Sequence, residues 1–432
     1  MMKKLGAVVL ITALVLQLFS INIFADEEGD TYFVSPDGSD IATAGTFENP
    51  FKTISYAGNF LKPGDTCYIR EGVYRETVTP ANNGTADNPI TYEAYMDEKV
   101  VISGCDLVTD WVKHQGNIYK ASMDWDISNG EGNIVFVNEQ LGFEGRWPNN
   151  QNDILDNSTY PVMSSAGSTT IDSSYSKVIV SGTNIPIVEA GTKFWCVADP
   201  GYNSITGVVM ETTTKTSIAI KTKNTSQPVT GDIYALIGSL ALVDIQGEWY
   251  KDRDNQLLYV YSDVNPNTIE IEAKKRNYGI DLSDRKNIIF NKVDLRATSI
   301  KTNDNTTNCT YKQGVVDTVG RKMVEIGTPS SDGIEINGTY NTIIGCEIKN
   351  CYGMAIKLNG SYNRVVNNWI HDTNFEGSNC RAVWINGSNQ LVSHNTISDT
   401  GRFATGGTFT DSVISYNDMY NTEGITKDGG VL

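Results

Sequence analysis

The chain has 432 residues, of which 51 are acidic and 34 are basic, giving a formal net charge of −17. Such an acidic chain is poorly suited to bind nucleic acid or an anionic membrane, which leaves neutral polymers as the favoured partners. Its seven cysteines show neither metal-binding spacing nor the dense, even framework of a disulfide-stapled fold. We therefore expect no metal site, no cofactor and no disulfide framework.

The first 25 residues have the pattern of a secretory signal peptide. Lys3 and Lys4 precede an apolar run over residues 5–19, and acidic residues follow Ala25. We predict cleavage after Ala25 and secretion of the mature chain. An uncleaved membrane anchor is the alternative, because the run approaches the ~20 residues that cross a bilayer. No later segment is as apolar, so we expect no stable membrane insertion after cleavage.

Residues 26–152 are expected to contain an N-terminal cap and the first strands of a solenoid. Apolar residues fall on one face of a short helix that follows Pro50, namely Ile54, Ala57, Phe60 and Leu61. Such a face, placed before the first strand, can cover the open end of a strand stack, where core and unpaired edges would otherwise meet water.

Residues 153–263 have a different pattern. Short alternating strands, such as 177–181, 216–221 and 257–261, are separated by turns rich in Gly, Asn, Thr and Pro. This pattern predicts an inserted, small antiparallel β-sandwich-like domain.

Residues 264–432 are expected to form the regular part of the solenoid. The phrase at 333–341 (GIEINGTYN) recurs at 355–363 (AIKLNGSYN) and at 382–390 (AVWINGSNQ). Repeats of about 20 to 50 residues indicate stacked supersecondary units, and these contain only short β-branched segments joined by Asn and Gly turns. The fold class is therefore all-β, a parallel β-helix, whose long straight face suits a linear polymer.

The repeat also predicts which side chains lie inside the solenoid. Asn368, Asn395 and Asn417 align in successive coils, where stacked amides can hydrogen-bond along a corner. Alternation then directs six apolar residues into the core and leaves Glu335 and Lys357 outside. The six are Ile334, Ile336, Ile356, Leu358, Val383 and Ile385.

One corner of the solenoid is the candidate site of chemistry. At this corner one pair of successive strands is expected to be joined by only four residues, 349–352. Long loops are expected at the same corner in the next three coils, at 371–381, 398–407 and 420–429. Glycoside hydrolysis needs two carboxyl groups across the scissile bond, and adjacent coils, ~4.8 Å apart, space them suitably. The candidate catalytic residues are Asp428 with Asp399 or Glu423, ahead of Asp372. Turn shaping is the alternative role for each aspartate.

Four further residues near this corner are candidate substrate contacts. Trp384 projects from a strand face and could stack against a sugar ring. Arg381 and Arg402 could hold hydroxyl groups or tune a carboxylate pKa. Glu376 adds another carboxylate to the same loop.

Several phrases resemble secreted β-helix proteins that handle polysaccharides. They are 32–39 (YFVSPDGS), 49–57, 61–74, 142–149 (GFEGRWPN), 247–259 and the Asp-Gly-Gly at 428–430. The chain is most similar to β-helical glycoside hydrolases of the β-xylosidase, xylanase and α-fucosidase kind. The resemblance implies a right-handed solenoid with a sandwich-like insertion, and an O-glycosyl hydrolase acting on plant-type polysaccharide or oligosaccharide. We expect a monomer.

Two other functions stay open at this point. A polysaccharide lyase of the pectate or alginate type would use a Lys or Arg base and often Ca²⁺. A noncatalytic carbohydrate-binding β-helix would bind a polymer on its strand face without cleaving it. The sequence identifies neither the sugar nor the stereochemistry. Since Leu432 falls inside an expected strand, we expect either a longer chain or an incomplete last coil.

Overall fold

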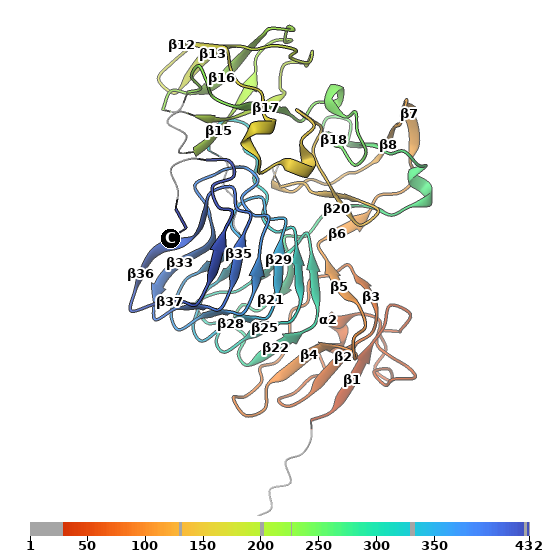
Figure 1. The fold of residues 1–432 in the computed structure, drawn as a ribbon. Coiled ribbons are helices and arrows are strands. Elements are labelled where there is room, and N and C mark those ends of the chain that lie inside the picture. The colour runs from red at the N-terminus through yellow and green to blue at the C-terminus, as the bar shows by residue number, and fades with distance from the viewer. Residues whose placement is uncertain are drawn as a thin grey trace, which may run out of the picture.

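The computed structural model describes residues 29–128, 132–198, 203–225, 227–328, 333–426 and 430–431. The predicted signal peptide, at residues 1–25, lies outside these residues. The described chain is almost entirely β. Residues 31–103 and most of the C-terminal half form a coil stack, and antiparallel sheets lie beside it (Figure 1). Within the described residues, no helix is both long enough and apolar enough to cross a membrane.

Three sets of parallel strands form the coil stack, as predicted for a β-helix. In the first sheet each strand pairs in parallel with the equivalent strand of the next coil. Its strands are β1 (Thr31–Val34), β2 (Thr66–Ile69), β4 (Ile90–Ala94), β22 (Ile288–Asn291), β25 (Thr310–Lys312), β28 (Thr342–Ile344), β31 (Arg364–Val366), β34 (Leu391–Ser393) and β37 (Val413–Ser415).

The second and third sheets complete each coil. The second contains β3 (Gly72–Tyr74), β5 (Val100–Ser103), β23 (Asp294–Arg296), β26 (Val315–Asp317), β29 (Glu347–Lys349), β32 (Trp369–Ile370), β35 (Thr396–Ser398) and β38 (Asp418–Tyr420). The third contains β27 (Ile334–Ile336), β30 (Ile356–Leu358), β33 (Arg381–Ser388) and β36 (Phe403–Thr410), and continues toward the parallel pair β21 (Tyr278–Asp281) and β24 (Ser299–Lys301).

The interior of the stack is one continuous apolar core, which explains the alternation in the repeat. All six predicted core residues, from Ile334 to Ile385, are at most 4% exposed and belong to this core. The register pairs Glu335 with Lys357 and Lys357 with Trp384 on the outer face. The predicted inside and outside positions of the repeat are therefore confirmed.

The predicted asparagine ladder is present. The Asn368 backbone N–H donates to the Asn395 Oδ1 at 2.9 Å, and the Asn395 N–H donates to the Asn417 Oδ1 at 2.9 Å. A second ladder at another corner runs through Asn341 and Asn363 in the same way. These side chains satisfy buried backbone donors that the turns would otherwise leave unpaired, and so lock the coil register.

The expected helix is short, and it lies between β1 and β2 rather than before the first strand. Helix α2 (Ile54–Ala57) begins after Thr53, whose side chain accepts from the Tyr56 N–H. Ile54 and Ala57 are fully buried in the coil core, and the helix contacts β1. Its role as a cap for the end of the stack stays a prediction.

Antiparallel sheets occupy the segment between the early and the later coils. The largest has its own apolar core and contains β11 (Arg146–Trp147), β12 (Ser165–Thr170), β13 (Tyr175–Ser181), β14 (Lys193–Ala198), β15 (Asn203–Val209), β16 (Ser217–Lys223) and β17 (Tyr234–Ile237).

Two four-stranded sheets face each other across another apolar core. One contains β7 (Val112–Gln115), β8 (Ile118–Ser122), β18 (Trp249–Asp252) and β19 (Leu257–Tyr261). The other contains β6 (Cys105–Leu107), β9 (Val135–Val137), β10 (Gln140–Gly142) and β20 (Ile271–Lys274). Antiparallel pairing thus joins strands on both sides of residues 153–263. Domain boundaries at 152 and 263 stay predictions.

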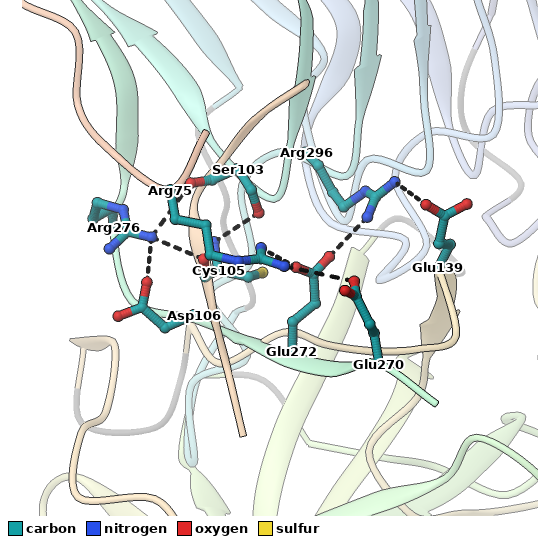
Figure 2. Close-up of polar contacts among 9 residues, drawn as sticks. All are labelled: Arg75, Ser103, Cys105, Asp106, Glu139, Glu270, Glu272, Arg276 and Arg296. Atoms are coloured by element: carbon teal, nitrogen blue, oxygen red, sulfur yellow. Dashed lines mark hydrogen bonds and ion pairs between the residues drawn. The ribbon is translucent and has the colours of Figure 1, made fainter. Parts of the chain in front are cut away.

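Ion pairs attach strand β20 to the coil stack. Glu272 on β20 is 2% exposed, and Figure 2 shows it between Arg75, which follows β3, and Arg296 at the end of β23. Arg296 also lies 3.5 Å from Glu139, next to β10. Because the buried Glu272 carboxylate has two cationic partners, it fixes this antiparallel sheet above the second parallel sheet.

Candidate active site

A cleft of ≈ 1030 Å³ lies between the coil stack and the chain segments that include β10 and the 3-10 turn Gln151–Asp153. One wall is the corner where the strands of the second sheet end. The opposite wall is formed by residues 139–143 and 151–156. A smaller groove of ≈ 200 Å³ continues along the second sheet and shares Asp317 and Lys349 with the cleft.

The coil wall presents carboxylates from several coils. Asp317 ends β26, Asp399 directly follows β35, and Asp372 lies two residues after the end of β32. Asp372 and Asp399 occupy a corner column with Asn350 and Asn421, and all four have φ between +50° and +57°. Asn and Asp tolerate this left-handed conformation better than other residues with a Cβ. Asp372 and Asp399 therefore shape the turn and also line the cleft.

Register sets the spacing of these carboxylates. Ile370 pairs with Ile397, so Asp372 and Asp399, two residues further on, belong to adjacent coils, ~4.8 Å apart. That spacing approaches the ~5–5.5 Å of a retaining carboxylate pair. Asp317 lies one coil before Lys349 and two before His371, so its distance to Asp372, but not to Asp399 one coil further on, approaches the ~6.5–9.5 Å of an inverting pair.

Hydrogen bonds orient the side chains of this wall. The Asn421 Nδ2 donates to the Asp399 Oδ1 at 3.1 Å, and the Asn350 Nδ2 donates to the Asp317 Oδ1 at 2.8 Å. The Asp372 Oδ2 lies 2.6 Å from the Nδ1 of His371. The far wall adds the exposed carboxylates of Glu139, Asp153 and Asp156.

An apolar floor separates the cleft from a second, buried charge cluster. Phe143, Ile154 and Phe375 line both the cleft and an inner cavity of ≈ 30 Å³. Glu144, Arg321 and Glu376 also line this cavity. Its volume is sufficient for a water molecule but not for a sugar.

The two glutamates of this cavity have opposite electrostatic environments. Burial would raise the pKa of Glu144, but Lys193, at 2.9 Å, and Arg321, which is hydrogen-bonded to it, lower the pKa to about 2. Burial raises the pKa of Glu376 to about 7, because Arg321 and Lys193 offset it only in part. Neither carboxyl oxygen of Glu376 has a hydrogen-bond partner among the described residues.

The structure brings the predicted catalytic residues together only in part. Asp399 lines the cleft. Glu423 is half-buried between two residues of the cleft wall, and its N–H donates to the Arg402 carbonyl. Asp428 lies outside the described residues.

The predicted substrate contacts lie away from the cleft lining. Trp384 is on the outer face of the third sheet, with the Arg381 guanidinium 4.4 Å from its ring centroid. Glu376 and Arg402 are 2% and 4% exposed, and Arg402 is hydrogen-bonded to Asn203. Contact of either buried residue with a substrate would require this corner to rearrange.

Of the three successive long loops that were predicted, the one at 398–407 is wrong. Strand β36 begins at Phe403, so only residues 399–402 separate it from β35. The segment 403–407 extends β36 alongside β33, where Gly407 pairs with Ile385. A longer connection, between β26 and β27, precedes this corner and supplies Arg321 to the inner cavity.

Sequence reasoning missed Asp317, Lys349 and the far wall. Aligning strand ends would have found the first two, since Asp317 and Lys349 occupy the position just before the corner column. The far-wall carboxylates come from chain segments about 160 or more residues away from the coil corner. No local pattern in the sequence indicates that pairing.

The part of the chain that the structure describes contains no cluster of three or more His, Cys, Asp or Glu side chains arranged to hold a metal ion. A reaction at this corner that uses protein groups alone would rely on proton transfer and nucleophilic attack.

Comparisons with known proteins show two local similarities in sequence. No family model matches the chain. It is 43% identical over 96 residues to the uncharacterized protein YwoF of Bacillus subtilis (strain 168), covering 22% of this chain and 20% of YwoF. It is 42% identical over 77 residues to the pectate lyase PEL9 of Emericella nidulans, covering 17% of this chain and 18% of PEL9. The matches thus span about a fifth of each relative.

Solved structures are similar over most of the chain. The complex of XylC with xylose has a TM-score of 0.54 at 17% identity, covering 91% of this chain and 62% of XylC. A structure described as a glycoside hydrolase has a TM-score of 0.52 at 15% identity, covering 92% of this chain and 97% of its own. At these identities the similarity establishes a shared fold, and function has to be argued from the site.

Proposed function

We propose that the protein is a glycoside hydrolase that cleaves a polysaccharide or oligosaccharide in the cleft beside the second sheet. The observation that carries this proposal is the set of carboxylates at one corner, where Asp317, Asp372 and Asp399 come from different coils. The carboxylates of Glu139, Asp153 and Asp156 lie on the opposite wall of this cleft, whose volume is ≈ 1030 Å³. An acidic cleft of this kind fits a neutral sugar chain and the two-carboxylate chemistry of glycosidases.

Each carboxyl group has a definite task in the proposed reaction. In a retaining reaction one carboxylate attacks the anomeric carbon as the glycosidic C–O bond breaks, while a carboxylic acid gives its proton to the leaving oxygen. Water then releases the sugar, and the acid group takes up the proton of that water. Asp399 is the best-supported member of the pair, with Asp428 or Glu423 as its partner. Asp372, one coil away, is the next candidate.

The finer identity of the enzyme is part of the same proposal. We propose secretion after signal cleavage, a right-handed solenoid with a capped N-terminal end and an inserted domain, and a monomer without a cofactor. Activity of the β-xylosidase type is favoured by the resemblance of several phrases and by the fold shared with XylC. The substrate contacts proposed on the third sheet are Trp384 and Arg381, with Arg402 and Glu376 behind the corner.

A polysaccharide lyase is the second candidate, favoured by Lys349 in the acidic cleft and by the local similarity to PEL9. A lyase base must give up its proton near neutral pH. Burial lowers the pKa of Lys349, but its ion pair with Glu347, at 2.8 Å, outweighs this and raises the pKa. Lys349 is therefore poorly suited as a base, and the hydrolase is preferred. A noncatalytic carbohydrate-binding protein is the remaining alternative.

The test is a reducing-sugar assay on xylan, fucosylated glycans, pectin and alginate, with and without chelator, for the protein and for Asp399→Asn. We expect chelator-resistant release of saturated sugars, and a loss of about 100-fold or more in Asp399→Asn. Unsaturated, cation-dependent products would identify a lyase. Polymer that is retained but never cleaved would identify a binding protein. Activity in Asp399→Asn within about threefold of the unchanged protein would remove Asp399 from the reaction.

A further inference from the structure

Strand β20 carries two charged side chains toward the coil stack, and only one of them has an ionic partner among the described residues. Ile271 and Ala273 lie in the apolar core between the two four-stranded sheets. Alternation directs Glu272 and Lys274 to the other face. Glu272 is paired with Arg75 and Arg296 (Figure 2). Lys274 is 5% exposed, and no described residue makes a hydrogen bond or ion pair with its Nζ.

Lys274 is largely buried and its ammonium group has no ionic partner among the described residues, which is costly, so this position requires an explanation. Burial lowers the pKa of Lys274 to about 8, and its weak opposing influence is the Cys105 thiol. The lysine therefore still carries its proton at neutral pH. The other buried lysine in these sheets, Lys251, is 8% exposed and donates to the Met123 carbonyl at 2.5 Å.

Lys274 lines a separate pocket of ≈ 200 Å³ between β20 and the coils that follow it, which include β21, β24 and β27. The pocket shares Arg321 with the inner cavity, but none of its described lining residues lines the catalytic cleft. Lys322 adds a second positive charge, and it is exposed. The lining also contains apolar Ile127 and Ile300 and several polar side chains of sugar-binding type, namely Asn277, Tyr278, Ser299, Thr302 and Asn337.

The other charges of the pocket are already neutralised. Lys301 lies 2.9 Å from Asp281, and Arg321 is paired with Glu144. The single acidic group of the described lining, Glu335, lies 3.0 Å from Lys357. Lys274 and Lys322 therefore give the described lining of the pocket a net positive character, within a chain whose net charge is −17. An anion is the complementary ligand.

We infer that this pocket binds the carboxylate of an acidic saccharide, such as a uronate residue, with the Lys274 ammonium as its counter-ion. The hydroxyl and amide groups around Lys274 suit sugar hydroxyls, whereas a bare anion would use the lysine alone. The saccharide part of this inference rests on the proposed function. The pocket is distinct from the catalytic cleft, so it acts as a second recognition site for substrates or side branches that carry a carboxylate.

Calorimetric titration with galacturonate, glucuronate, galactose and acetate tests the inference without using turnover. We expect both uronates to bind at millimolar or better concentration, and galactose and acetate to bind at least about tenfold more weakly. No uronate binding, or equal binding of acetate and uronate, would overturn the assignment. Because binding is measured directly, failure of the hydrolase proposal leaves this result interpretable.

Variants identify the lysine. Lys274→Met should abolish uronate binding while the far-UV circular dichroism stays unchanged, and Lys274→Arg should retain binding within about tenfold. Lys251→Met is the matched control, because it removes a buried lysine outside the pocket, and uronate binding should be unchanged. Uronate binding that survives in a folded Lys274→Met protein would overturn the role of Lys274. If Lys274→Met does not fold, Lys274→Arg and the titration of the unchanged protein decide the question.

Discussion

The two glutamates of the inner cavity, Glu144 and Glu376, predict opposite pH dependences of the free energy of unfolding. Glu376 binds its proton more tightly in the folded chain, because burial raises its pKa from the ordinary value of 4.5 to about 7. The folded state then holds more protons than the unfolded state between these two values, so the free energy of unfolding falls as pH rises through that window. Above about pH 7 the whole penalty, about 3 kcal/mol, is present.

Glu376→Gln removes this titration. The amide costs the same at every pH, so the difference in unfolding free energy between variant and unchanged protein isolates the carboxyl. We expect this difference to shift by about 3 kcal/mol in favour of the variant between about pH 4 and about pH 8. Urea unfolding followed by circular dichroism at both pH values measures it. A difference that does not change with pH would refute the assignment of a buried, unpartnered carboxyl.

Glu144→Gln is the contrasting variant in the same cavity. The pKa of Glu144 is lowered to about 2, so its stabilising contribution is present above the unfolded value and is lost only as pH falls through about 2. The variant also leaves Arg321, which is 7% exposed, without its anionic partner. We expect Glu144→Gln to destabilise the protein by about 3–5 kcal/mol near neutral pH. Stabilisation by this change would contradict the paired geometry.

Two further outcomes test the coil stack and its outer face. Asn395→Ala should lower the free energy of unfolding by about 3 kcal/mol. The Asn395 amide is 1% exposed, accepts from the Asn368 backbone N–H, and donates to Asn417 and to the Val365 carbonyl. Asn417 is half-buried, so Asn417→Ala should lower this free energy clearly less. Equal losses in urea unfolding would argue against the ladder. Trp384→Ala should raise the KM for long polymer about fivefold but leave short-oligosaccharide kinetics unchanged, because Trp384 is outside the cleft lining; a change in kcat on both would place it in the reaction.

The coil stack could be predicted from the sequence because its register is written into a repeat. Ile334, Ile356 and Val383 recur at equivalent positions, and each pairs or stacks with the next at the expected place. Only the coil wall of the cleft could be predicted from the sequence, and the opposite wall could not. Asp399 follows from the corner column, whereas the far wall depends on how β10 and residues 151–156 lie above the coils. That placement depends on tertiary contacts such as those of Glu272, which no local pattern encodes.

Loop length was the least predictable feature, for a definite physical reason. The segment after Asp399 looks like a loop because it contains Gly406 and Gly407, yet it continues β36 alongside β33. A Cβ at Gly407 would lie 1.9 Å from the Ile385 carbonyl oxygen, so glycine is required by close strand approach rather than by a turn. Glycine marks both situations, and only the structure distinguishes them.

The corner column explains why chemistry can be placed on this scaffold at little structural cost. Its left-handed backbone favours Asn and Asp, and these two residues differ in charge but hardly in shape. Asn350 and Asn421 hold the same conformation as Asp372 and Asp399, so exchanging amide for carboxylate leaves the turn intact. The number and spacing of carboxylates along the cleft can therefore vary independently of the fold. For the same reason Asp399→Asn is a clean test of catalysis, because it removes the charge while keeping the residue type that the corner requires.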